Sequence, residues 1–278
     1  MNVTILGCGY VGTAVARYWT QTLGLRVTAT TTTPERIQSL NTIADRVEVV
    51  KGNDSVGLKS LLKDQEVVLL SVAAQGRTRS IEAYQQAYLE TAETLASILP
   101  ELPEIKQLIY TGSFAVYGDQ NGKEVNESSP AYPANENNEI LLKTEETLFN
   151  IASHRLKVCI LRLGGIYGEH REIHRIFSRI AGKTRPGDGK YITHWVHLED
   201  IVGAIEFARQ HQLDGLYNLV DCSQYTIREL IELVCKKHNL EPVNWDESQP
   251  NSSLYNIQVS NQKILEAGYQ FIHPTTQF

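Results

Sequence analysis

The sequence predicts an α/β fold in which a doubly wound parallel sheet is joined to a smaller, mixed C-terminal lobe. Two observations support this: apolar strand-like runs alternate with helix-like stretches, and a glycine-rich turn follows the first run. Such alternation builds βαβ units, whose parallel strands are covered by helices on both faces. We expect 1–168 to form the sheet domain and 169–278 to form most of a second lobe, with 195–220 packing back on the first.

The elements of the first part follow one another regularly. Strands are predicted at 2–9, 26–31, 47–52, 66–73, 106–113 and 157–168, and helices at 11–23, 34–43, 56–64, 81–99 and 135–152. After about residue 168 the alternation loosens, with helices predicted at 172–182, 195–210, 226–239 and 260–269 and a strand at 215–220. Thr226 stands three residues before Glu229, the spacing of a capping box at a helix start.

The composition is that of a soluble globular chain of 278 residues, with 42% apolar and 21% charged residues. A net charge of −6 disfavours non-specific nucleic-acid binding, and RNA binding is the least favoured function. There is no apolar run long enough to span a membrane and no signal peptide pattern, so we expect a cytoplasmic protein. The four scattered cysteines are expected to be reduced core residues, and no metal site is expected.

The first strand runs into the turn GCGYVG, in which Gly7, Gly9 and Gly12 form a G-x-G-x-x-G pattern around Tyr10 and Val11. The first glycine permits a tight turn, the second lets the backbone approach a pyrophosphate, and the third lets helix and strand pack closely. The pattern stands after a strand, at the start of a helix and of a series of βαβ units, as a dinucleotide site requires. We therefore predict a Rossmann-type dinucleotide-binding domain in preference to a purely structural turn.

The end of the second strand favours NADP over NAD as the cofactor. A carboxylate that binds the ribose of NAD is absent there, whereas Thr31, Thr32 and Arg36 offer hydroxyl donors and a positive charge to a 2′-phosphate. The alternative is that Arg36 only lies on a solvated helix face. Ser71 and Ala73 end the fourth strand and are expected near the cofactor ribose, because ligands of such sheets bind beyond the carboxyl ends of the strands.

Four short motifs are distributed over most of the chain: GCGYVG (7–12), TGSFAVYG (111–118), LRLGGIYG (161–168) and WVHLEDIVGAIEFA (195–208). With these motifs the chain resembles an atypical, extended short-chain dehydrogenase/reductase, similar to the NAD(P)-dependent epimerases and dehydratases of nucleotide sugars. The resemblance implies that Thr111 lies beside the cofactor and that Ser113 hydrogen-bonds the substrate oxygen that gains or loses a proton. It also implies a general acid/base Tyr and a Lys, spaced Tyr-x-x-x-Lys on the next helix.

That helix does not contain the expected tyrosine. Counting back four residues from Lys143 gives Glu139, whereas a second register puts Asn137 and Leu141 at the Tyr and Lys positions. Glu139 is a candidate base if burial raises its pKa, with Lys143 beside it; the favoured alternative is an ordinary surface pair. Tyr132 is the nearest tyrosine, in a turn between two prolines.

Candidate substrate contacts come from the later motifs. Tyr117 and Tyr167 end strands and either line the pocket or pack in the core. A helix over 172–182 would align a basic ridge with Arg171 and Arg175, suited to a diphosphate but as easily a solvated face. His197 and Asp200 are interpreted as structural residues at a helix start rather than as a catalytic dyad.

Two functions remain open. The first is an NADP-preferring epimerase, dehydratase or reductase of a nucleotide-linked sugar or related polyol, acting as a monomer or homodimer on a small-molecule substrate. The second is a catalytically silent NADP(H) sensor. The missing tyrosine strengthens this alternative, but the pocket-lining motifs keep the enzyme as the favoured function.

Overall fold

The computed structural model describes residues 1–74, 80–251 and 255–278, and the chain forms two compact units. Neither unit is continuous in sequence. The first consists of Met1–Ser113, Asn135–Arg162 and Val202–Tyr217, and the second of Phe114–Ala134, Leu163–Ile201 and Asn218–Phe278. Of the stretch 195–220, residues 202–217 thus belong to the first unit.

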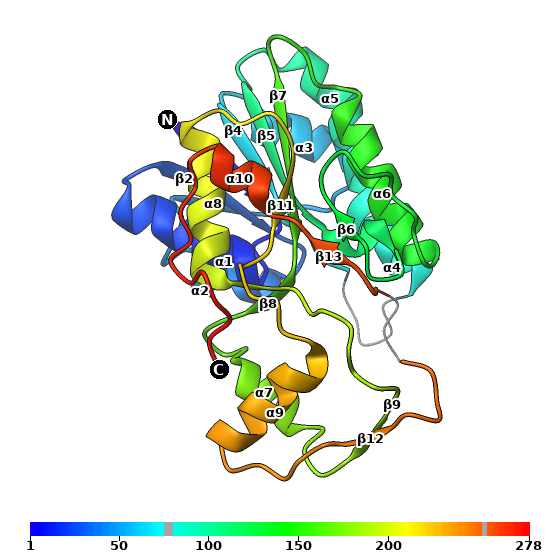
Figure 1. Ribbon diagram of the computed structural model, residues 1–278. Helices are drawn as coiled ribbons and strands as arrows, with labels where there is room; N and C mark the ends of the chain where they lie inside the picture. The colour runs from blue at the N-terminus through cyan, green and yellow to red at the C-terminus, as the bar shows by residue number, and fades with distance from the viewer. Residues whose placement is uncertain (75–79, 252–254) are drawn as a thin grey trace. The chain divides into compact units, whose positions relative to one another are not determined.

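A seven-stranded sheet forms the centre of the fold (Figure 1). Its strands are β1 (Asn2–Leu6), β2 (Arg26–Thr31), β3 (Arg46–Val49), β4 (Val67–Leu70), β5 (Gln107–Ser113), β7 (Lys157–Leu163) and β11 (Gly215–Leu219). They lie in the order β11-β7-β5-β4-β1-β2-β3, and β1 pairs in parallel with both β2 and β4. The strand order therefore reverses between β1 and β4, which is where a doubly wound sheet opens a crevice for a ligand.

Helices cover both faces of this sheet, as Figure 1 shows. The helical segments of this part of the chain are α1 (Tyr10–Arg17), the π-helical turn η1 (Tyr18–Thr22), the 3-10 turn η2 (Pro34–Arg36), α2 (Ile37–Leu40), α3 (Ser55–Leu62), α4 (Ile81–Tyr84), the π-helical turn η3 (Gln85–Leu89), α5 (Glu90–Ile98), the 3-10 turn η4 (Leu99–Glu101), α6 (Glu136–Phe149) and α8 (Leu198–Gln210). The predicted α/β fold with a doubly wound sheet is thus confirmed.

Burial explains why the strands read as continuous apolar runs. All four residues of β4 are buried, because helices lie over both faces of the strand. One core cluster joins Leu58 of α3, Leu95 of α5 and Leu148 of α6 to the sheet residues Val68 and Tyr110. On the η1 and α8 side, the Trp19 indole N–H donates to the buried Glu206 carboxylate at 2.9 Å.

The second unit is built from short helices and strands. These are the 3-10 turn η5 (Phe114–Tyr117), β6 (Glu124–Val125), β8 (Gly165–Tyr167), α7 (Ile173–Ser178), β9 (Thr184–Pro186), β10 (Trp195–His197), α9 (Ile227–Lys237), β12 (Asn244–Asp246), β13 (Gln258–Val259) and α10 (Gln262–Glu266). Three parallel strand pairs, β10–β8, β12–β9 and β13–β6, connect residues far apart in sequence. Helix α9 begins with the predicted capping box of Thr226 and Glu229.

The helix expected over 172–182 is much shorter in the structure. It spans only Ile173–Ser178, because Ile173 and Phe177 suffice to bury one turn against α9 and the chain then turns through Gly182 at a positive φ of 71°. Among the described residues, no helix is long and apolar enough to cross a bilayer.

Candidate dinucleotide site

The glycine turn lies at the carboxyl end of β1, next to that of β4. Gly7 has a φ of +93°, and a Cβ there would lie 2.6 Å from the Ser71 carbonyl oxygen. A Cβ at Gly12 would collide with the Gly7 carbonyl oxygen. A Cβ at Gly9 would meet no protein atom within 4 Å. Packing therefore explains why glycine is needed at 7 and 12, whereas Gly9 faces open space.

The open space at Gly9 adjoins the N-terminus of helix α1. Gly9 is the N-cap and has no side chain to satisfy the amides of the first turn, and no acidic residue lies in that turn. Tyr10 and Val11 begin the helix, and only Val11 is buried. The first amides of a helix and its dipole attract an anion. The turn can therefore receive a phosphate group at Gly9 without moving any side chain.

A hollow of about 660 Å³ extends from the glycine turn along the carboxyl ends of four strands. Its walls come from 6–9, 30–33, 50–53 and 71–74, together with Arg36, Leu58, Ala83, Gln86, Ala87 and Thr91. None of these described lining residues is Asp or Glu, and two of them, Arg36 and Lys51, are basic. The hollow thus carries the charge that a polyphosphate ligand requires.

Arg36 is fixed against the glycine turn. Its guanidinium donates to the Cys8 carbonyl oxygen and, at 3.1 Å, to the Thr13 hydroxyl. These two contacts orient the side chain along the wall of the hollow, rather than out on a solvated helix face. Thr32 is exposed, whereas Thr31 is buried and its hydroxyl accepts from the Thr33 amide at 3.1 Å.

The ends of β4 and β5 are linked by polar side chains. The Thr111 and Ser71 hydroxyl oxygens lie 3.3 Å apart, and Ser71 and Ala73 both line the hollow. The Cys8 thiol is not a nucleophile here, because burial raises its pKa to about 12 and keeps it protonated.

The sequence did not point to Lys51, Gly52 and Asn53, which follow β3 and line the same hollow. The rule that ligands bind beyond the carboxyl ends of parallel strands would have pointed to them.

The candidate catalytic residues lie outside this hollow. Ser113 is the last residue of β5 and is half-buried. Glu139 and Lys143 are exposed on α6, where no ion pair between them occurs among the described residues. Leu141 is buried and Asn137 half-buried on the same helix. No tyrosine anywhere in the sequence has a lysine four residues later.

A buried ion pair that the sequence did not reveal supports the end of β5. Arg162 of β7 contacts Glu145 of α6 with an Nη2–Oε2 distance of 2.6 Å, and the side chains are only 5% and 2% exposed. Burial raises the pKa of Glu145, and the Arg162 charge opposes that shift. A Cβ at Gly112 would lie 3.0 Å from the Glu145 carboxylate, so the pair packs against the backbone next to Ser113.

Both tyrosines predicted near a substrate lie deep in the second unit. The Tyr117 side chain is 0% exposed, and its phenol oxygen lies 2.9 Å from both the Asn126 carbonyl oxygen and Asn218 Oδ1. The Tyr167 phenol accepts the Gln277 amide at 3.0 Å, and burial raises its pKa to about 12. Substrate contact by either tyrosine stays a prediction.

The predicted basic ridge does not form. Because α7 begins at Ile173, Arg171 lies before the helix, in a bridge to Gly168, and of the two arginines only Arg175 is helical. Arg175 is exposed and forms an ion pair with Glu172 at 3.1 Å. The two arginines therefore do not share one helical face.

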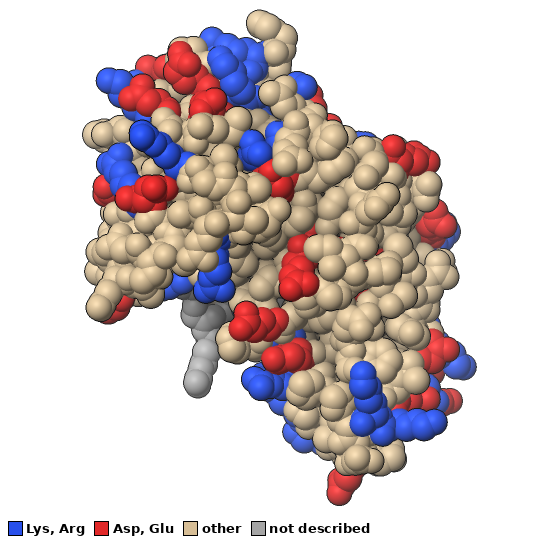
Figure 2. Space-filling model, turned by 90° about the vertical axis from the view of Figure 1, so that its left-hand side faces the viewer, with Lys and Arg blue, Asp and Glu red and all other residues tan. Residues whose placement is uncertain are grey.

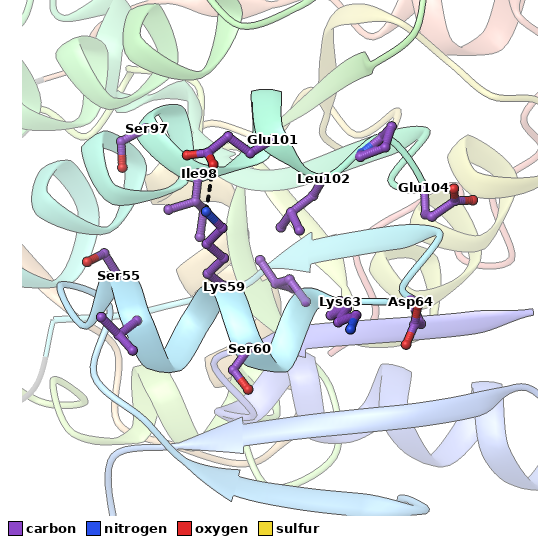
Figure 3. A pocket seen from close by; sticks show the side chains of 13 residues that line it. Ser55, Lys59, Ser60, Lys63, Asp64, Ser97, Ile98, Glu101, Leu102 and Glu104 are labelled. Atoms are coloured by element: carbon purple, nitrogen blue, oxygen red, sulfur yellow. Dashed lines mark hydrogen bonds and ion pairs between the residues drawn. The ribbon is translucent and has the colours of Figure 1, made fainter.

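A second hollow, of about 880 Å³, lies between α3 and α5 (Figure 3). Figure 3 shows the Lys59–Glu101 ion pair crossing it, at 2.6 Å, and both partners are largely exposed. Its lining includes Asp64 and Glu104, which precede β4 and β5. It therefore lies toward the amino ends of the strands, away from the glycine turn.

On the face drawn in Figure 2, basic and acidic side chains lie side by side and no continuous basic field forms.

The chain is similar to known proteins over most of its length. The model of the NAD dependent epimerase/dehydratase family matches residues 3–219. Protein YeeZ of Escherichia coli strain K12 is 29% identical over an alignment of 280 positions, which covers 98% of this chain and 96% of YeeZ.

Two solved structures illustrate the shared fold. A dTDP-glucose 4,6-dehydratase from Bacillus anthracis, in complex with NAD, has a TM-score of 0.81 at 18% identity and covers 98% of this chain and 92% of its own. A UDP-glucose 4-epimerase from Thermotoga maritima, with UDP-glucose, has a TM-score of 0.79 at 20% identity and covers 96% and 92%.

Proposed function

Because the chain belongs to the NAD-dependent epimerase/dehydratase family, we propose that it binds NADP(H) at the glycine turn and acts on a nucleotide-linked sugar or a related polyol. The observation that carries the proposal is the hollow at the β1/β4 reversal: Gly9 is open to a phosphate, and the wall is basic with no acidic lining residue. A ligand with three phosphate groups suits that charge better than one with two.

The preference for NADP rests on Arg36. Its guanidinium has five N–H donors, and the contacts to Cys8 and Thr13 leave several of them for a 2′-phosphate. The absence of a carboxylate from the described lining removes the partner that would bind the ribose of NAD and repel a phosphate.

The chemistry is proposed to take place beyond β5, where Ser113 would orient a substrate hydroxyl or carbonyl group. We keep Tyr117, Tyr167, Arg171 and Arg175 as candidate substrate contacts, and a monomer or a homodimer would suffice. Exposed Glu139 and Lys143 are weak replacements for a tyrosine base, because solvent screens the charges of both side chains. A catalytically silent NADP(H) sensor therefore remains the second candidate.

The cofactor proposal is tested by titrating NADPH and NADH into the full chain and following nicotinamide fluorescence. We expect tighter binding of NADPH. Arg36→Met should lower the NADPH/NADH affinity ratio about tenfold or more, since a charged hydrogen bond contributes about 1.5–3 kcal/mol. Loss of the contacts to Cys8 and Thr13 affects both cofactors alike, so the ratio isolates the 2′-phosphate. Exposed Arg17→Met on α1 is the matched control, and equal affinities in the wild-type chain would overturn the proposal.

The enzyme and the sensor are separated by a turnover assay. The chain, loaded with NADP+ or NADPH, is incubated with UDP- and dTDP-linked hexoses, and products are separated by chromatography. Conversion of any sugar supports the enzyme, whereas tight NADPH binding without conversion favours the sensor.

A further inference from the structure

Three side chains able to bind a metal ion lie together in the second unit. His197 ends β10, Glu199 lies in the first turn of α8, and His273 belongs to the C-terminal segment. One ligand atom of each lies within 4.8 Å of the other two. Chain folding, not sequence proximity, brings His273 to this place.

The three groups already contact one another through their polar atoms. His273 Nε2 lies 2.7 Å from Glu199 Oε2, and His197 Nδ1 lies 3.8 Å from the same oxygen. The two imidazole rings are 3.8 Å apart between centroids. Ligand atoms of a tetrahedral zinc ion, each about 2.1 Å from the metal, are spaced on the same scale. His197 Nδ1 accepts the Glu199 backbone amide at 3.2 Å, so an ion bound through this nitrogen would replace that hydrogen bond.

The neighbouring Asp200 holds the backbone that carries His273. Its carboxylate accepts the Ile272 amide at 2.6 Å and the His273 amide at 3.0 Å, and its Oδ1 lies 3.1 Å from the Tyr269 hydroxyl oxygen. Asp200 is 0% exposed. These bonds place His273 over the start of α8 before any ion binds, which lowers the entropic cost of assembling a site.

We propose that His197, Glu199 and His273 bind one divalent transition-metal ion, with Zn²⁺ as the favoured species. Two imidazoles and one carboxylate are donors that zinc binds readily, and three protein ligands leave a fourth position for water. The two histidine side chains are 16% and 24% exposed, and that of Glu199 is 63% exposed. An ion can therefore enter from solvent while the rings stay held by the surrounding protein.

Such an ion would fasten the C-terminal segment to α8. Beyond His273, that segment donates the Thr276 hydroxyl to Asp221 at 2.6 Å and the Gln277 amide to the Tyr167 phenol at 3.0 Å. The Tyr167 ring also contacts the His197 ring, with centroids 5.0 Å apart. The ion would thus stabilise the contacts that hold Tyr167, whether or not the chain is an enzyme.

A second histidine pair provides an internal comparison. The rings of His174 and His238 stack with centroids 4.6 Å apart. No third metal-binding side chain completes a group around them in the described part of the chain. Removing His174 therefore tests whether this pair, rather than the three proposed ligands, binds the ion.

The test uses the untagged full chain, freed of metal with a chelator and titrated with Zn²⁺ against a chromophoric chelator. We expect one Zn²⁺ per chain, and visible bands of tetrahedral coordination when Co²⁺ replaces it. Glu199→Gln and His273→Ala should each weaken binding by at least about 100-fold, because even partners of a ligand contribute about 10–100-fold. His174→Ala should bind as the wild type does.

Zinc should also raise the melting temperature of the wild-type chain and of His174→Ala, but not of Glu199→Gln. Glu199→Gln changes one exposed group and keeps its shape, so it reports on the ion even if His273→Ala unfolds. Absence of zinc binding by the wild type, equal affinity in Glu199→Gln, or loss of binding in His174→Ala would each overturn the proposal.

Discussion

Replacing Glu145 by Gln is predicted to destabilise the first unit strongly. Arg162 donates to the Glu145 carboxylate through Nη2 at 2.6 Å and through Nε at 3.1 and 3.2 Å, and both side chains are nearly inaccessible to water. The substitution keeps the shape of the side chain but leaves a buried guanidinium without a countercharge. Breaking a buried pair in this way costs about 3–5 kcal/mol.

The melting temperature is the assay for that loss. At about 2–4 °C per kcal/mol for a chain of this size, Glu145→Gln should melt about 6–20 °C below the wild type. Glu146→Gln, at the exposed neighbouring position on α6, is the control and should stay within about 0.5 kcal/mol. The double variant Glu145→Leu with Arg162→Met should recover most of the loss, because it removes both charges together. Equal melting temperatures for Glu145→Gln and Glu146→Gln would refute the reasoning.

Three further predictions follow from single positions. Gly12→Ala should destabilise the fold by about 1–3 kcal/mol in chemical unfolding, because its Cβ collides with the Gly7 carbonyl oxygen; unchanged stability would contradict this. Burial raises the pKa of Asp221 to about 6, above its unfolded value of about 3.9, so ionising the carboxylate lowers the stability progressively from about pH 4 to 6 and fully above. The melting temperature of the wild type should therefore fall relative to that of Asp221→Asn between pH 4 and 7. A constant difference between the two melting temperatures would refute this. In a turnover assay, Ser113→Ala should lose at least tenfold, about 1.4 kcal/mol, and keep its NADPH affinity; unchanged turnover would remove Ser113 from the mechanism.

The local sequence pattern was sufficient to predict the sheet and the glycine turn. The first strand, its three glycines and the succession of βαβ units are all readable within short windows, and the carboxyl ends of β2 and β4 lie where the strand rule puts them. Arg36 could be named from its place after the second strand.

What the sequence could not reveal depends on contacts between distant segments. Glu145 and Arg162 look like ordinary charged residues until α6 packs on β7, and His273 meets Glu199 only because Asp200 binds the C-terminal backbone. The predicted end of the helix over 172–182 was wrong for a related reason. The spacing of the basic residues matched a helix, but tertiary packing stabilises only the turn that buries Ile173.

The affinity of Gly9→Val for NADPH tests the central claim most directly. A Cβ at Gly9 meets no protein atom within 4 Å, so the variant should melt within a few degrees of the wild type. Its side chain would nevertheless occupy the place proposed for the pyrophosphate, and fluorescence titration should show NADPH binding weakened by at least about tenfold, or about 1.4 kcal/mol. A folded Gly9→Val chain that binds NADPH as tightly as the wild type would contradict a diphosphate site at this turn.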